Sequence, residues 1–164
     1  MSAPENLVWI DLEMTGLDPG VDVILQAALV ITSSDLEPLA EAAVVIHQPD
    51  EVLARMTPFV HEMHTRTGLI ERVRSAAATL AEADEAFVQA ITPLCAAPAV
   101  LCGNSIGTDR RFIARYLPQL EKVLHYRMVD VSSIKVLAQR WYGPSAVFQK
   151  PDAGAHEFRK ALEP

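Results

Sequence analysis

Cysteine is scarce in this sequence, with only Cys95 and Cys102 among its 164 residues. Two cysteines so close together are too few for a disulfide scaffold or a zinc site, which makes the reducing cytoplasm the expected location. Long apolar runs are also missing, and none approaches the roughly 20 residues that cross a bilayer. The amino terminus has no basic segment followed by an apolar one, so we expect a chain that is neither exported nor inserted into a membrane.

Basic residues are outnumbered by acidic ones. The chain has 14 Lys and Arg against 21 Asp and Glu, a formal net charge of −7. This balance argues against a protein that coats long nucleic acid, duplex included, by neutralising its phosphates. A short or terminal piece held at one metal site remains compatible with it. Length and the 50% of apolar residues favour one globular domain over residues 1–164 with a single sizeable core.

The stretch 7–17 (LVWIDLEMTGL) carries the strongest chemical signal. Its apolar start predicts a buried strand that ends in acids. Because side chains alternate along a strand, Asp11 and Glu13 face one side and Leu12 faces the core. Two carboxylates at one spot repel each other unless a cation neutralises them, and a hard divalent cation with oxygen ligands suits the pair. A solvated strand end followed by a turn is the alternative that this stretch alone leaves open.

The pattern along the chain predicts strands followed by alternating helices and strands. Apolar and β-branched runs predict strands at 7–11, 23–32, 39–47, 99–102 and 127–131. Helical spacing predicts two or three short helices within 51–74, and further helices at 79–94, 106–116, 118–124 and 132–141. Asp50 is the expected cap of the first helix, and Thr79 with Glu82 is an expected capping box.

The order of these elements predicts an α/β fold. Short turns join the first three strands into an antiparallel meander, and the later strands alternate with helices, so we expect a mixed five-stranded sheet flanked by helices. Residues 143–164 are rich in Gly, Pro and Ala, and we expect a loop followed by the start of a helix there.

Asp109 is a further acid that could lie near the acidic end of the first strand. It lies in a helix expected after the strand 99–102 and the turn 103–105, which would bring the acid over the sheet, near the end of a neighbouring strand. A third carboxylate would suit two-metal chemistry. On composition alone, a lone Asp in a helix is more often a solvated surface group.

Three groups of residues together resemble one enzyme family. They are residues 9–17 (WIDLEMTGL), 102–105 (CGNS) with 109–112 (DRRF), and 124–127 (LHYR) with 130–133 (DVSS). They closely resemble the oligoribonucleases of the DEDD group of 3′-to-5′ exonucleases, with compatible spacing from about residue 7 to residue 142. The resemblance implies a ribonuclease H-like fold and a homodimer. It also implies hydrolysis of very short RNAs, above all 5′-phosphorylated dinucleotides, to nucleoside monophosphates.

The resemblance further implies a set of catalytic residues. Asp11, Glu13 and Asp109 match three of the four carboxylates that hold two Mg²⁺ or Mn²⁺ ions per active site, which activate the attacking water and stabilise the leaving 3′ oxygen. His156 stands at about the place of the histidine that acts as general base. Tyr126 matches a tyrosine that one subunit contributes to the active site of the other.

Other positions match the family's substrate-binding residues. Leu17 matches a wedge between the two bases, and Phe59 takes the place of an aromatic, usually Trp, on which a base stacks. The residues that match the 5′-phosphate cap are His64, Ser105, Arg127 and Ser132. Arg and hydroxyl donors suit that task through charge-assisted hydrogen bonds. Taken singly, each of these residues would be assigned to the core, a turn, a strand or the surface, and only their joint spacing gives them a role.

Two features depart from the family pattern. The family's third motif is His-X-Ala-X-X-Asp, but the place of its Asp after His156 is taken by Ala161, so Glu163 becomes the candidate fourth metal ligand and the C-terminal helix is expected to be truncated. Gln26 stands where the family usually has Glu. One alternative is therefore a catalytically impaired relative that binds short nucleotides or only dimerises. Another is a DNA-proofreading exonuclease of the same group, against which the phosphate cap argues.

Overall fold

One mixed sheet organises the chain, whose residues 5–146 are described by the computed structural model. Its strands are β1 (Leu7–Met14), β2 (Ile24–Thr32), β3 (Pro38–Val45), β4 (Ala99–Gly103) and β5 (Leu124–Asp130). They lie in the order β3-β2-β1-β4-β5. β1, β2 and β3 form the antiparallel meander, whereas β4 pairs in parallel with both β1 and β5. The predicted α/β fold with a mixed five-stranded sheet is thus confirmed.

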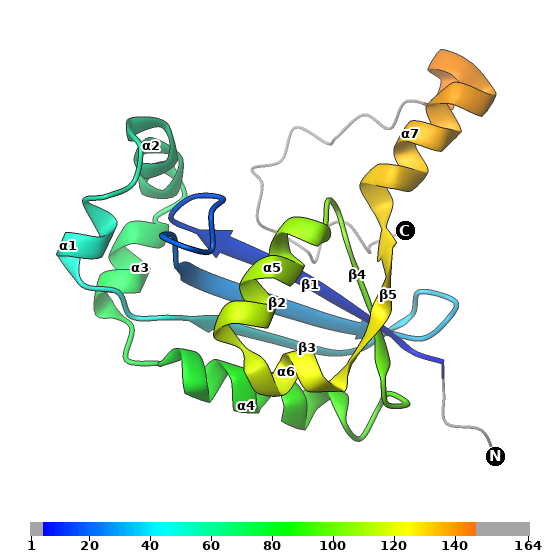
Figure 1. Cartoon of the computed structure of the whole chain (residues 1–164), viewed down its shortest axis with the longest axis horizontal. Helices are drawn as coiled ribbons and strands as arrows, with labels where there is room; N and C mark the ends of the chain where they lie inside the picture. The colour runs from blue at the N-terminus through cyan, green and yellow to red at the C-terminus, as the bar shows by residue number, and fades with distance from the viewer. Residues whose placement is uncertain (1–4, 147–164) are drawn as a thin grey trace.

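Helices flank the sheet and extend from one of its ends. Within residues 5–146 they are α1 (Asp50–Leu53), α2 (Pro58–Arg66), α3 (Leu69–Ser75), α4 (Leu80–Ile91), α5 (Gly107–Tyr116), α6 (Pro118–Val123) and α7 (Val131–Tyr142), followed by the 3₁₀ helix η1 (Gly143–Ala146). Figure 1 shows α1, α2 and α3 gathered at one end of the sheet and α7 projecting away from it. None of the helices in this part of the chain has the length and apolarity that a bilayer span requires.

The main core lies between the sheet and the helices α4, α5 and α6. The side chains Val8, Ile10 and Leu12 of β1 are buried in it, together with fully buried Phe87 of α4 and Phe112 of α5. Strand alternation explains why every second residue of β1 enters this core. A second cluster packs the layer of α1 and α3 onto β2, and consists of Leu25, Leu53, Met56, Leu69, Ile70 and Val73.

The local signals of the sequence place the elements with small shifts. The stretch 51–74 forms three short helices, and the capping box at the start of α4 is present: the Thr79 hydroxyl accepts from Glu82 N, and Glu82 Oε2 accepts from Thr79 N at 2.7 Å. β5 begins at Leu124, earlier than the predicted residue 127. Of the expected loop and helix start at 143–164, the described part is η1; the rest, including the expected truncated helix, lies outside the described residues.

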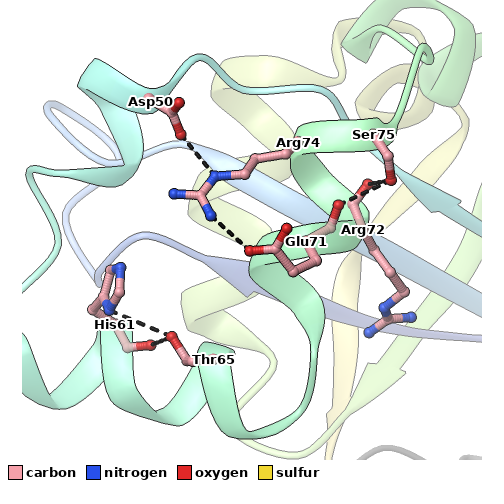
Figure 2. Close-up of polar contacts among 7 residues, drawn as sticks. All are labelled: Asp50, His61, Thr65, Glu71, Arg72, Arg74 and Ser75. Atoms are coloured by element: carbon pink, nitrogen blue, oxygen red, sulfur yellow. Dashed lines mark hydrogen bonds and ion pairs between the residues drawn. The ribbon is translucent and has the colours of Figure 1, made fainter.

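The expected role of Asp50 as a helix cap is wrong. The N-cap of α1 is Pro49, and no side chain caps this helix. Asp50 is instead the first residue of α1 and accepts a hydrogen bond from Arg74 Nε at 2.8 Å, while Glu71 accepts from Arg74 Nη1 at 2.6 Å (Figure 2). The carboxylate therefore pairs with an arginine of α3 that a local pattern does not indicate. Figure 2 also shows the neighbouring Arg72 directed away from this group.

Candidate active site

The acidic end of β1 follows from strand alternation. Leu12 is 5% exposed and packs in the core, whereas Asp11 is exposed and the Glu13 side chain is 16% exposed. The two carboxylates therefore lie on the face opposite Leu12, as the sequence predicts. Gln26 of β2 lies directly across from Glu13. A neutral side chain at that place adds no further negative charge beside Glu13.

Asp109 joins the two strand acids from the first turn of α5. β1 pairs with β4 only as far as Trp9, so the backbone beyond it has no strand neighbour on that side. Asp109 Oδ1 accepts a hydrogen bond from Leu12 N at 3.0 Å, and the residue is only 7% exposed. Gly103 allows the end of β4 to approach the backbone of β1 closely, since a Cβ there would lie 3.0 Å from the Ile10 carbonyl oxygen. Asp109 is thus a buried partner of β1 and not a solvated surface group.

Crowding of the three carboxylates changes their acidity. Burial, with the negative charges of Asp11 and Asp109, raises the pKa of Glu13 to about 7, although Arg72 acts in the opposite direction. Burial and the charge of Asp11 also raise the pKa of Asp109 to about 6, against the hydrogen bond from Leu12, which lowers it. Each anion is therefore destabilised by its surroundings, and the effect of Arg72 on Glu13 does not offset burial and like charge.

The donor chemistry of this cluster fits a hard divalent cation. Carboxylate oxygens are the preferred ligands of Mg²⁺ and Mn²⁺, and a cation would offset the burial and the mutual repulsion that raise the two pKa values. Within residues 5–146, no three His, Cys, Asp or Glu side chains already form a set that could hold a metal ion. The other expected members of the site, His156 and Glu163, lie outside the described residues.

His64 of α2 lies behind the acidic strand end. It is fully buried, its Nε2 donates to the Met14 carbonyl oxygen across 2.9 Å, and its Nδ1 is 3.8 Å from Glu13 Oε2. The ring thus contacts both Glu13 and the backbone next to it. In this arrangement His64 supports the carboxylate strand, and its expected contact with a substrate phosphate stays a prediction.

The residues expected to contact bases are open to solvent. Leu17, in the turn after β1, is 70% exposed, and Phe59, in the first turn of α2, is 76% exposed. Phe59 also lines a shallow pocket with Glu62, Met63 and Arg66. An exposed aromatic face such as that of Phe59 is suited to stacking against a base, and an exposed leucine can make apolar contact with one.

Two of the four residues expected at the phosphate end, Ser105 and Ser132, lie together where β4 and β5 end, whereas His64 lies in α2 and Arg127 within β5. Ser105 lies in the loop after β4, and Ser132 lies in the first turn of α7. Both backbone N–H groups donate to Oδ1 of Asp130, at 2.9 and 3.0 Å. Asp130 carries no assignment from the sequence, although an Asp directly before a helix is a common N-cap signal.

Arg127 and Tyr126 lie together on β5. The guanidinium carbon of Arg127 is 5.4 Å from the centre of the Tyr126 ring, a cation–π distance. Both side chains are exposed, and Tyr126 is 73% exposed. β5 is an edge strand of the sheet, so another chain can reach these residues.

Large apolar side chains are exposed along this edge and along α7. No residue of α7 is buried. The exposed apolar side chains of β5 and α7 are Tyr126, Met128, Ile134, Val136, Leu137, Trp141 and Tyr142. We call them the β5/α7 surface. Several large exposed apolar side chains on one helix and the edge strand that precedes it are typical of an interaction site.

Comparison with known proteins identifies the family. The exonuclease family model matches residues 8–157. The chain is 50% identical over 145 residues to an oligoribonuclease of Pseudomonas paraeruginosa, which covers 86% of this chain and 79% of that protein. It is 51% identical over 153 residues to an oligoribonuclease of a Mycobacterium species (strain KMS), with 92% of this chain and 71% of that protein covered. The chain belongs to the oligoribonucleases of the exonuclease family.

Solved structures support the fold of this oligoribonuclease family member. The zinc-bound form of an Escherichia coli exonuclease I complex with single-stranded DNA has a TM-score of 0.61 at 13% identity over 90% of this chain. An exonuclease I from Methylocaldum szegediense has a TM-score of 0.62 at 17% identity over 96% of it. The chain spans about a third of the length of these proteins (32% and 34%). At such low identity the likeness establishes the ribonuclease H-like exonuclease fold alone.

Proposed function

We propose that this chain is a metal-dependent 3′-to-5′ exoribonuclease that degrades very short RNAs, above all dinucleotides, to nucleoside monophosphates. The observation that carries the proposal is the convergence of Asp11, Glu13 and Asp109 from two elements. Burial and like charge raise the pKa of Glu13 to about 7 and that of Asp109 to about 6. Membership in the oligoribonucleases supports the same reaction class.

Asp11, Glu13 and Asp109 are the proposed ligands of two Mg²⁺ or Mn²⁺ ions, with Glu163 as the proposed fourth. When bound, these ions would acidify the attacking water and stabilise the leaving 3′ oxygen. The chain's own part is to hold the carboxylates in place: the Leu12 N–H fixes Asp109, and His64 lies against Glu13. His156 is the proposed general base that takes the proton from the water.

The proposed substrate site has an apolar end and a phosphate end. Leu17 and Phe59 offer exposed apolar faces to the two bases, and Ser105, Arg127 and Ser132 offer hydroxyl and guanidinium donors to the 5′ phosphate. A site that holds the far end of a dinucleotide leaves no room for a longer strand. The net charge of −7 supports the same length preference, because it disfavours long phosphate backbones.

The proposed assembly is a cytoplasmic homodimer. The β5/α7 surface has the apolar character of an interface that pairs with a second copy. Tyr126 lies on this surface, and we place it at the active site of the opposite subunit. A monomer would then hold an incomplete site.

Turnover of a 5′-phosphorylated diribonucleotide tests the function directly. With saturating Mn²⁺ or Mg²⁺, the chain should release nucleoside monophosphates, and the variant Asp11→Ala should not. A folded protein that binds the dinucleotide but never hydrolyses it at any metal concentration would contradict the proposal and favour the catalytically impaired relative. Competition between a dinucleotide and a long single strand separates the proposal from a proofreading exonuclease, since only the latter would prefer the long strand.

A further inference from the structure

Asp130 connects two segments that are distant in sequence. It ends β5 and is the N-cap of α7. Its Oδ1 accepts hydrogen bonds from Ser132 N at 3.0 Å and from Ser105 N at 2.9 Å, and its Oδ2 accepts from the Ser133 hydroxyl at 3.0 Å. Helix capping alone requires only the first of these contacts. The contact with Ser105 is additional to the cap. Oδ1 accepts both the capping hydrogen bond from Ser132 N and the hydrogen bond from Ser105 N.

Sheet register brings the two segments together. β4 and β5 are parallel and Gly103 pairs with Asp130, so the loop after β4 lies beside the start of α7. A second contact joins the same parts, because Lys135 Nζ of α7 donates to Asn104 Oδ1 at 3.2 Å. Two neighbouring residues of the loop, Asn104 and Ser105, are therefore hydrogen-bonded to α7 or to its N-cap.

Ser105 adopts a backbone conformation that needs support. Its φ of 55° lies in the left-handed region, which L-residues other than glycine, asparagine and aspartate rarely adopt. Such a conformation persists when surrounding contacts fix it. The hydrogen bond from Ser105 N to Asp130 is a contact of that kind.

The two serine hydroxyls are left available by this arrangement. Asp130 engages the backbone N–H groups of Ser105 and Ser132, and within residues 5–146 neither serine hydroxyl makes a hydrogen bond. Because both N–H groups donate to one oxygen atom, the backbone nitrogens of the two serines lie within two hydrogen-bond lengths of each other. Their hydroxyls are thus free to serve one common ligand.

We propose that Asp130 is a positioning residue for the 5′-phosphate end of the substrate: it holds Ser105 and Ser132 side by side so that both hydroxyls bind one phosphate. This inference rests on the proposed function and adds to it the residue that organises the phosphate end. Asp130 itself does not touch the phosphate, because both of its oxygens accept hydrogen bonds from the chain. The competing explanation is a simple helix cap, whose loss would weaken α7 without affecting one substrate more than another.

Four variants separate positioning from capping. Asp130→Asn keeps an Oδ1 acceptor that both N–H groups can share. Asp130→Ser keeps a good N-cap for α7, but its side chain is one atom shorter and is not expected to reach Ser105. Asp130→Ala removes both functions. Ser133→Ala is the matched control, because it removes only the contact to Oδ2.

The readout is the steady-state rate with two dinucleotides that differ only in a 5′ phosphate or a 5′ hydroxyl. The wild-type chain should favour the phosphorylated substrate. Asp130→Ser and Asp130→Ala should raise KM for that substrate by about tenfold, the effect of losing a charge-assisted hydrogen bond, with kcat unchanged. Both variants should hydrolyse the 5′-hydroxyl substrate like wild type. Asp130→Asn and Ser133→Ala should keep the preference.

The possible failures are distinguishable. If wild type is inactive or does not favour the phosphorylated substrate, the proposed function fails before any variant is used. If wild type shows the preference and Asp130→Ser retains it, the positioning role is overturned. An equal loss on both substrates overturns it as well, since that result marks a helix cap alone. Should Asp130→Ala not fold, Asp130→Ser carries the test, with its melting temperature as the check on α7.

Discussion

Asp109 combines two requirements in one side chain. Its Oδ1 accepts from Leu12 N at 3.0 Å, a contact that needs only an acceptor. Its negative charge is held beside Asp11, and burial together with the charge of Asp11 raises the pKa of Asp109 to about 6. The charge therefore works against stability and is expected to serve cation binding. The two requirements can be separated, because an amide keeps the acceptor and lacks the charge.

The variant Asp109→Asn should lose activity and gain stability. Removal of a proposed metal ligand should lower kcat by at least about a hundredfold. In a chelator at pH 8, loss of a repelled charge should raise the melting temperature by about 2 to 4 °C, which corresponds to about 1 kcal/mol in a domain of this size. Calorimetry and dinucleotide turnover measure the two effects. The exposed acid Asp35 provides the control, and Asp35→Asn should change neither quantity. An Asp109→Asn protein that remains active would contradict the assignment.

The turn between β1 and β2 is held rigid around Leu17. The Asp22 carboxylate accepts from the Thr15 hydroxyl at 3.0 Å and from Asp18 N at 2.9 Å. The Tyr116 hydroxyl of α5 lies 2.7 Å from the Asp22 carbonyl oxygen. These contacts fix a turn that presents an exposed leucine. The geometry of the turn, and not the Leu17 side chain alone, should therefore determine how Leu17 contacts the bases.

Gly16→Ala should disturb this turn. An added Cβ would lie 2.4 Å from Asp22 Oδ2, too close for any side chain, so the carboxylate must move and release its contacts. We expect kcat/KM for a dinucleotide to fall about tenfold, since misplaced binding groups commonly have effects of this order. Gly107→Ala is the control, because a Cβ there meets nothing within 4 Å. Equal activity of the two variants would show that the turn does not position Leu17.

α7 would be covered by the second subunit of the proposed homodimer. No residue of this helix is buried, and Ile134 is 54% exposed. Ile134→Glu places a charge on the β5/α7 surface and should convert a dimer to a monomer, as measured by analytical ultracentrifugation. Because Ile134 is only partly covered within its own subunit, the monomer should still fold, and circular dichroism should show an unchanged helix content. Gln139→Glu adds the same charge at an exposed place on the same helix and should leave the dimer intact. If Ile134→Glu remains dimeric, the interface lies elsewhere.

Local patterns in the sequence account for most helices and strands and for the placement of Asp11 and Glu13 in the candidate site. Strand alternation placed Asp11 and Glu13 opposite Leu12, and the Thr79 capping box marked the start of α4. Both features depend on neighbours within a few residues. Spacing within a strand or a helix is therefore sufficient to predict them.

Contacts between distant segments could not be predicted in this way. Asp50 was expected to cap a helix, but it pairs with Arg74 of another helix. The hydrogen bond from Leu12 N to Asp109 and the bond from Ser105 N to Asp130 also join separate elements. Each arises from the packing of the sheet and helices, which single-segment periodicity does not report. The proposed positioning role of Asp130 rests on such a contact, so the sequence alone did not indicate it.

The sheet as a whole places the acids and the proposed phosphate end at one edge. β1, β4 and β5 run in parallel, so their carboxyl ends lie at the same edge. β1 delivers Asp11 and Glu13 to that edge, β4 leads into the loop of Ser105, and β5 ends at Asp130. Ligand sites commonly form at the carboxyl ends of parallel strands. The proposed function requires a short substrate that spans this edge from the acids to the serines.

Global stability should depend on pH and on divalent cations together. The pKa of Glu13 is raised to about 7 and that of Asp109 to about 6, so each contributes stability that is present at low pH and is lost as the pH rises through these values. In a chelator, the melting temperature should therefore fall between pH 5.5 and pH 8. Mg²⁺ should restore stability at pH 8 and have little effect at pH 5.5, where protons already neutralise the carboxylates. The variant Glu13→Gln should flatten the pH dependence and weaken the response to Mg²⁺. A melting temperature that Mg²⁺ raises equally at both pH values would show that the cation binds away from these acids.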